Sequence, residues 1–283
     1  MKSIFANAFQ IHSNSSNVGI FVNSIEGLDS PQVRIATSEN AGGHGGIVSN
    51  VLYGLRSITL GGKVYSDTLA AYEQKRRALE NALRITRDTY NNPVPITLYF
   101  TTMDDLQMQV DVYVKSVVIK MKDLLIADFL IQFIAADFVL QSQTLQSSQV
   151  GVFGGGGVIY PVIYPITFTV GQSSVSSVTN NGNGEASPIL RFVGPLTNPR
   201  FINNTTGKVM HIETSILAGY SIEVDIKNKT IVQSDGANKI AYKSNDSDWL
   251  TIVPGVNYVQ MNTNDTTDTG YCTVEFRDSY LGV

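Results

Sequence analysis

NNGNGEASPILRFVGPLTNPRFINNTTGKVMHI, at residues 180–212, is the stretch that decides the fold of this chain. Short runs of β-branched and aromatic residues alternate in it with Asn-Gly, Asn-Pro and Thr-Gly pairs, which favour turns. The same pattern of short strand-like runs and turn-forming residues continues in LAGYSIEVDIKNKTIVQSDGANKIAY (217–242), SDWLTIVPGVNYVQM (247–261) and CTVEFRDSYLGV (272–283). From residue 166 onward the sequence offers about ten short strands, with turn signals roughly every 8–12 residues and no convincing helix, which predicts an all-β sandwich.

The region before this sandwich predicts a β domain with one helix. PQVRIAT, GGIVSNVLYG and RSITLGGKVYSD read as strands, and Gly61-Gly62 reads as a two-residue hairpin turn. A helix is expected at about residues 67–87, capped by Ser66 or Asp67 and stopped by Asn91-Asn92-Pro93. Its apolar stripe consists of Leu69, Tyr72, Leu79, Ala82 and Leu83.

Three apolar segments follow the helix: PITLYFT, Val110–Met121 and Leu124–Leu140. The alternation of valines changes phase within the second segment, which predicts a β-bulge near Lys115-Ser116. The third segment carries Asp128, Gln132 and Asp137, so we expect a buried strand pair there and not a membrane span. The first domain is therefore expected to be a β-sandwich or split barrel with one flanking helix.

The texture changes at residues 142–165, SQTLQSSQVGVFGGGGVIYPVIYP, where Gln, Ser, Gly and Pro dominate. We expect domains at 1–148 and 166–283, with a Gly/Pro-rich linker at 149–165. We expect no phosphate loop at the glycines Gly154–Gly157, because no Gly-Lys-Ser/Thr and no predicted helix follow them.

The order of landmarks in both halves resembles the distal tail (Dit) family of long-tailed bacteriophages. In the second half these are the Gly182/Gly184 turn before Pro188, then GPLTNPRFINNTTG, GYSIEVDI and WLTIVPGVNYV. In the first half they are SITLGGKVYSD, AYEQKRRALENAL, ITLYF and FLIQFIAADFVLQ. The resemblance implies a tail-tube-like first domain that closes a ring and a galectin-like jelly roll as the second domain.

Composition excludes several classes of partner and site. A net charge of −4 with scattered basic residues gives no electrostatic reason to expect a nucleic acid. The single cysteine, Cys272, permits neither an intrachain disulfide nor a thiolate metal cluster, and a buried small side chain is expected there. The N-terminal segment is unlike a secretory signal, and no membrane association is expected.

No acid–base or metal constellation stands out among the polar residues. His12, His44 and His211 lie in different contexts, and the His211-Ile212-Glu213 spelling of zinc deaminases lacks its cysteine partners. A surface or cross-strand pair is expected for His211 and Glu213. Polar turns are expected, instead of a calcium site, at the acidic pairs Asp104-Asp105, Asp246/Asp248 and Asp265/Asp268. We therefore expect no enzyme, no cofactor and no metal.

Trp249 is the one candidate contact for a carbohydrate. A tryptophan face stacks well on a sugar ring, and Asn245, Asp246 and Asp248 could bond its hydroxyls. The alternative is a core tryptophan, because DWLTI reads as the opening of a strand.

Two functions from different classes remain. The resemblance implies a structural virion protein, made in the host bacterial cytoplasm, that forms a homo-oligomeric ring, expected to be a hexamer, between the tail tube protein and the tail-tip protein. The alternative is a carbohydrate-binding module that recognises host cell-wall glycans through the second domain. The first predicts a buried Trp249, and the second predicts an exposed one in a shallow groove.

Overall fold

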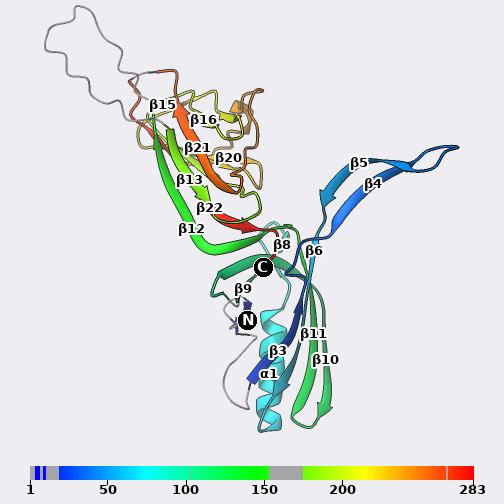
Figure 1. Ribbon diagram of the computed structural model, residues 1–283. Coiled ribbons are helices and arrows are strands. Elements are labelled where there is room, and N and C mark those ends of the chain that lie inside the picture. Colours follow the sequence, from blue (N-terminus) through cyan, green and yellow to red (C-terminus); the bar gives the residue numbers. More distant parts are fainter. Residues whose placement is uncertain (1–3, 7–8, 11–18, 103, 153–174, 266) are drawn as a thin grey trace, which may run out of the picture. The chain divides into compact units, whose positions relative to one another are not determined.

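A computed structural model describes residues 4–6, 9–10, 19–102, 104–152, 175–265 and 267–283 (Figure 1). The chain divides into two compact units, unit 1 with residues 1–143 and 280–283, and unit 2 with residues 144–279. The described part is mainly β with one α-helix, as the sequence predicts. No described helix has the length and apolarity needed to cross a membrane.

Unit 1 contains one helix and most of the long strands. Its elements are β1 (Ile4–Ala6), β2 (Phe9–Gln10), β3 (Gly19–Glu26), β4 (Val33–Glu39), β5 (Gly46–Tyr53), β6 (Arg56–Tyr65), α1 (Leu69–Ala82), β7 (Thr86–Arg87), β8 (Pro93–Val94), β9 (Ile96–Thr101), β10 (Gln107–Asp123), β11 (Ile126–Ala135) and the start of β12 (Leu140–Gly151).

The long strand β10 joins two parts of the unit 1 sheet. Its residues 107–112 pair with β9, which continues through β1 to β2, and its residues 112–123 pair with β11, which continues through β6 to β3. The core is formed by inward-facing side chains of these strands, among them Leu98, Val110, Phe133, Ile131 and Leu60. The predicted bulge is confirmed by a register shift between Val114 and Ser116.

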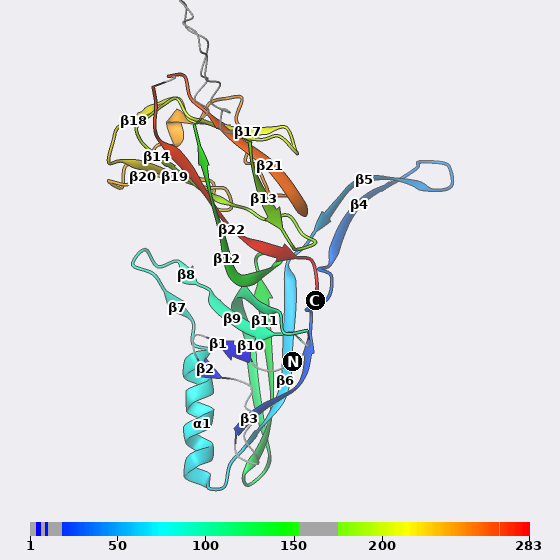
Figure 2. The same ribbon diagram turned by 60° about the vertical axis from the view of Figure 1, so that its left-hand side comes forward.

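The helix α1 runs alongside the strands of unit 1 (Figure 2). Tyr72, Leu79 and Leu83 belong to the same buried cluster as the strands, which confirms that part of the stripe, whereas Leu69 is exposed. The helix is shorter than predicted at both ends. The Thr68 hydroxyl, and not Ser66 or Asp67, caps it by accepting from the Ala71 amide at 3.2 Å.

The helix ends before Arg87 because the chain continues from it into the hairpin formed by β7 and β8. Thr86 pairs with Val94 and Arg87 with Pro93, so these residues are extended and the Asn-Asn-Pro sequence forms the turn of β7 and β8.

The prediction of a hairpin turn at Gly61-Gly62 is wrong. Both residues lie inside the central strand β6, where Gly62 pairs with Phe129 on one side and with Val22 on the other. A Cβ on Gly62 would lie 2.1 Å from the Phe21 carbonyl oxygen and 2.4 Å from the Phe129 ring. Gly62 therefore allows the Phe21 backbone and the Phe129 ring to pack closely against β6, and it does not form a turn.

The expected strand pair within Leu124–Leu140 is also wrong. Residues 126–135 form the single strand β11, which pairs with β10 and β6, and residues 136–139 form bends before β12 starts. A strand paired on both sides and buried on one face shows the same apolar density as a pair of shorter strands.

Unit 2 contains the remaining strands, which are mostly short. They are the rest of β12, then β13 (Val175–Asn180), β14 (Ile189–Val193), β15 (Leu196–Thr197), β16 (Arg200–Asn203), β17 (Lys208–His211), β18 (Ser215–Ile216), β19 (Ser221–Asp225), β20 (Thr230–Gln233), β21 (Gly255–Asn262) and β22 (Tyr271–Tyr280), with a 3₁₀ turn η1 (Ile240–Tyr242).

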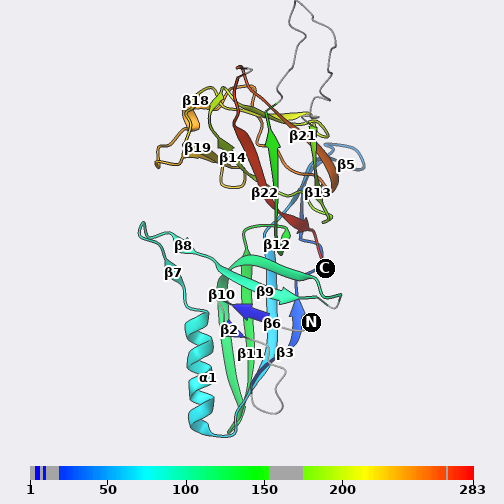
Figure 3. The same ribbon diagram turned by 90° about the vertical axis from the view of Figure 1, so that its left-hand side faces the viewer.

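Two sheets of unit 2 enclose one core (Figure 3). One has the strand order β12-β22-β14-β19-β20 and the other the order β13-β21-β16-β17. Side chains from both sheets, such as Phe192 and Val274 from the first and Phe201 and Met261 from the second, form a single buried cluster. Unit 2 is thus a β-sandwich, as expected for the region after residue 166.

The division into units differs from the predicted bounds at the C-terminus. The last four residues, 280–283, belong to unit 1 instead of the second domain, and the Val283 amide donates to the Leu28 carbonyl at 3.2 Å. The strand β12 extends to Gly151, into the predicted linker 149–165. The rest of that linker, with Gly154–Gly157, lies outside the described residues from position 153, and its character stays a prediction.

Candidate interaction surfaces

The strands β4 and β5 form a hairpin, residues 33–53, which we call the arm. Figure 1 shows the arm extending away from the other strands of unit 1. Every residue of both strands is exposed, and the two strands pair only with each other among the described residues. An isolated two-stranded hairpin is at best marginally stable in water, which makes the arm a candidate interaction surface.

The arm has one apolar face. Val33 pairs with Tyr53, Ile35 with Val51 and, after a bulge, Thr37 with Val48. Because side chains alternate across a strand, these residues share one side. The apolar members, Val33, Ile35, Val48, Val51 and Tyr53, are each between 42% and 58% exposed. The opposite side is mixed and carries Arg34, Ala36, Ser38, Ile47, Asn50 and Leu52.

Arg56 fixes the base of the arm. Its guanidinium donates to the carbonyl oxygens of Gly27 at 2.8 Å, Asp29 at 2.5 Å, Phe138 at 2.8 Å and Leu281 at 2.7 Å. The residue is only 2% exposed, and this burial lowers the pKa of Arg56, partly opposed by the charge of Asp29. One side chain therefore ties three other segments of unit 1 to the start of β6, next to the end of β5.

A ring contact adds to this anchoring. The Tyr53 ring stacks on the Phe138 ring with centroids 5.2 Å apart, and the Gly54 amide donates to the Gln32 carbonyl at 2.7 Å. The two ends of the arm are thus held in place, whereas its strands remain uncovered.

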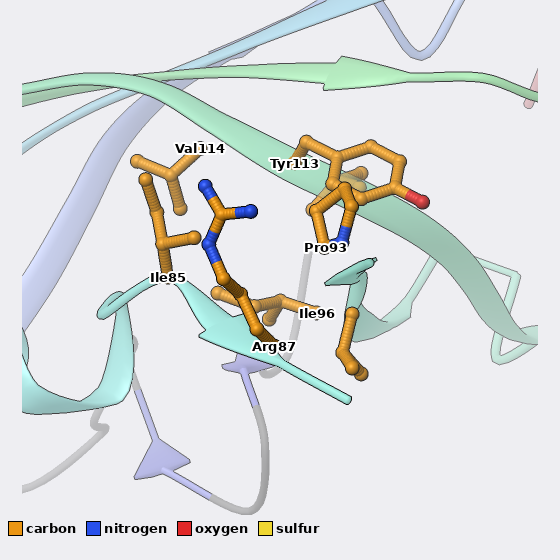
Figure 4. A pocket seen from close by; sticks show the side chains of 8 residues that line it. Ile85, Arg87, Pro93, Ile96, Tyr113 and Val114 are labelled. Atoms are coloured by element: carbon orange, nitrogen blue, oxygen red, sulfur yellow. The ribbon is translucent and has the colours of Figure 1, made fainter. Parts of the chain in front are cut away.

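The hairpin β7–β8 borders an apolar hollow on unit 1, which we call the groove (Figure 4). It has a volume of about 240 Å³ and is lined by Ile85, Arg87, Pro93, Val94, Ile96, Val112, Tyr113 and Val114. Ile96 and Val112 are buried and form its floor, while Ile85 and Val94 are 64% and 41% exposed at its walls. Arg87 is the one charged residue of this lining.

Asp88 organises the turn of the β7–β8 hairpin. One carboxylate oxygen accepts from the amides of Tyr90 at 2.9 Å and Asn92 at 2.8 Å, and the other accepts from the Asn92 side chain at 3.1 Å. These hydrogen bonds, led by the one from the Asn92 amide, lower the pKa of Asp88. The turn also contains Asn91 at φ 67°, in the left-handed region.

In unit 2, Trp249 is half-buried, so it matches neither the fully buried nor the freely exposed expectation. It packs against the core cluster of the sandwich, and the Lys243 ammonium lies 5.8 Å from its ring centroid. The segment around Trp249 is not a strand, although Leu250 and Ile252 are buried. A sugar would have to displace Lys243 or use another part of the ring.

His211 is paired with residues other than Glu213. It lies opposite Arg200 across strands β16 and β17, with 3.2 Å between Arg200 Nη2 and His211 Nδ1. Asp246 approaches both, at 3.4 Å from His211 and 3.2 Å from Arg200. Hydrogen bonding from Ser244, with smaller contributions from His211 and Arg200, lowers the pKa of Asp246.

The other predicted polar residues lie apart from one another. His44 is at the tip of the arm, and His12 lies outside the described residues. Asp104 accepts from the Thr102 hydroxyl, and Asp265 accepts from the Thr267 amide at 2.8 Å, as in polar turns. Asp268 instead accepts from the amide of Thr197, which is distant in sequence, at 2.7 Å. The part of the chain that the structure describes holds no group of three or more metal-ligating acids, histidines or cysteines. Cys272 is fully buried, which raises the pKa of its thiol.

Comparison with known proteins finds a family model that matches most of unit 2. Residues 181–280 match a family model described as the C-terminal domain of the siphovirus-type tail component of SPP1 Dit. The match covers most of unit 2, which is therefore similar to the C-terminal domain of Dit tail components. No curated protein matches the chain.

One solved structure shares the fold over both units. The Dit (gp 19.1) protein of SPP1, described as a paradigm of hub adsorption apparatus in phages that infect Gram-positive hosts, covers 98% of this chain and 98% of its own, with a TM-score of 0.68 and 14% identity. A chain of the phage P2 baseplate in its activated conformation with Ca is less similar: it covers 90% of the present chain and 89% of its own, at 12% identity and a TM-score of 0.46.

The sequence did not reveal the arm or the groove as surfaces. PQVRIAT and GGIVSNVLYG predict strands, but their apolar residues are the same as those of any half-buried strand. Their exposure in the described structure is what marks them as a candidate interaction surface.

Proposed function

We propose that this chain is a Dit protein that forms the distal tail ring, a homo-hexamer that joins the tail tube to the tail-tip apparatus of the virion. The observation that carries the proposal is the arm, with its exposed apolar face on a hairpin that has a rigid base. A closed ring provides each arm with the same neighbouring surface, and closure prevents open-ended association through this apolar face.

The ring leaves two further surfaces, one on each side, for other proteins. We assign one to the last ring of the tail tube and the other to the tip protein, in keeping with the family to which unit 2 belongs. No catalytic role is assigned to any residue. Recognition of a host glycan through Trp249 stays a prediction. The Lys243 ammonium over the indole ring does not favour the stacking of a sugar on that face.

The test is a mass measurement by light scattering over a range of concentrations. The wild-type protein is expected to assemble into particles of six chains, visible as rings by electron microscopy. Val51→Lys, on the apolar face of the arm, is expected to remain monomeric, because a lysine ammonium is costly to bury against apolar side chains. The matched control is Asn50→Lys, one residue away on the opposite face, which should still form rings.

A wild-type protein that is monomeric at every concentration would contradict the self-assembling ring. Equal assembly of Val51→Lys and Asn50→Lys would show that the ring closes through other surfaces. Both substitutions are at exposed positions, so their folding can be confirmed by circular dichroism before the comparison.

A further inference from the structure

The proposed ring requires a second surface on each copy. In a closed ring every contact joins two different surfaces, so the arm of one copy meets some other part of the next copy. That part has to be concave and apolar to cover the apolar face of the arm. The groove on unit 1 has this character, with a buried floor of Ile96 and Val112 and apolar walls from Ile85 and Val94.

The charges of the arm and the groove are complementary. Glu39 is the last residue of β4 and lies two positions after Thr37, so it shares the apolar face with Val33 and Ile35. Apart from Glu39 this face is uncharged. The lining of the groove likewise contains a single charged residue, Arg87. An apolar strip that ends in one anion thus corresponds to an apolar hollow that carries one cation.

The groove is not occupied by the arm of its own chain. No arm residue lines the groove, and the residues of both arm strands are exposed. We propose that the groove receives the apolar face of the arm from a second copy of this chain, with Glu39 opposite Arg87. This inference rests on the proposed ring and names the surface that receives the arm.

The two kinds of contact have different roles. The apolar side chains supply most of the affinity, since their burial removes exposed surface from water. The pair of Glu39 and Arg87 lies at the rim, where it adds little affinity but disfavours wrong registers. Arg87 is already oriented, because its guanidinium donates to the Asn91 carbonyl at 2.9 Å within the β7–β8 hairpin.

A charge exchange tests this pairing. Glu39→Arg places two cations opposite each other, and Arg87→Glu places two anions opposite each other. Each single change is expected to raise the concentration for half-assembly about tenfold, as like charges in contact disfavour association. The double variant Glu39→Arg/Arg87→Glu restores the opposite pair and should return to within about threefold of the wild type. Arg34→Glu, a charge reversal on the opposite face of the arm, is the control and should assemble normally.

Cross-linking provides an independent measurement. Ile35→Cys and Val94→Cys introduce one thiol in the arm and one in the groove, and the native Cys272 is buried and does not compete. The chain carrying both should form covalent ladders between copies on oxidation, whereas either single variant should give no species beyond a dimer. A double charge variant that assembles as poorly as the single variants, together with no ladder, overturns the groove assignment.

The outcomes separate this inference from the ring itself. A wild type that forms rings without rescue and without ladders leaves the ring standing and rejects the groove. A wild type that stays monomeric, with no ladder from the two-cysteine chain, rejects both. Rescue and ladders in a particle of other than six chains would support the groove and correct the number of subunits.

Discussion

Arg56 is the single side chain on which the local architecture of unit 1 depends most. Replacing it by alanine leaves four carbonyl oxygens without their donor, and we expect a loss of roughly 3–5 kcal/mol in the stability of unit 1. The loss of stability in Arg56→Lys should be smaller than in Arg56→Ala, because a lysine ammonium keeps the charge but cannot donate hydrogen bonds in the same directions. Urea unfolding followed by far-UV circular dichroism measures both changes.

The control for this experiment is Arg191→Ala, which breaks an exposed ion pair with Glu223. A pair of this kind contributes at most about 1 kcal/mol. If Arg56→Ala and Arg191→Ala destabilise the protein equally, the network around Arg56 has been overrated.

Substitution of Gly62 tests whether close packing explains why the Gly61-Gly62 pair lies inside β6 and not in a turn. Gly62→Ala places a methyl group against the Phe21 carbonyl and the Phe129 ring, and a loss of about 2 kcal/mol or more is expected from overpacking. Gly43→Ala, where a Cβ meets nothing within 4 Å, should change stability by no more than about 0.5 kcal/mol. Thermal unfolding measures the change in stability of both variants. A Gly62→Ala variant as stable as the wild type would contradict the packing argument.

At the scale of elements, the sequence predicts unit 2 better than unit 1. In unit 2 the residues that predict turns adopt turn conformations in the structure. Positive φ angles occur at Asn198, Gly207, Gly236 and Gly255. In unit 1 the glycine pair in β6 serves packing, and the helix end is set by the pairing of β7 with β8, which is remote from the helical pattern. Whether an apolar strand is covered, as in β11, or uncovered, as in the arm, depends on the rest of the fold and not on the strand.

The β7–β8 hairpin should loosen in acid through Asp88. Its hydrogen bonds lower the pKa of Asp88 in the folded state. A lowered pKa means that the carboxylate stabilises the hairpin above the pKa of the unfolded chain, about 3.9, and that this stabilisation is lost as the pH falls through the folded value. Hydrogen exchange of the Tyr90 and Asn92 amides should therefore show reduced protection toward low pH, after correction for intrinsic rates.

The neutral variant Asp88→Asn isolates this effect. It should show the reduced protection already at neutral pH and little further change toward low pH. Protection of the wild-type amides that stays constant from neutral pH to pH 2 would exclude a role for the carboxylate.

At the scale of the whole molecule, the arm links stability to concentration. If rings bury the apolar face, the folded state gains free energy from association, and the Tm of unfolding rises with protein concentration by mass action. For a chain of this size the rise should be about 2–4 °C for each tenfold increase in concentration. Val51→Lys, which lacks the contact, should unfold at the same Tm at every concentration, whereas Asn50→Lys should follow the wild type. Calorimetry over two decades of concentration measures this, and identical, concentration-independent Tm values in all three proteins would show that the arm is not buried by a neighbour.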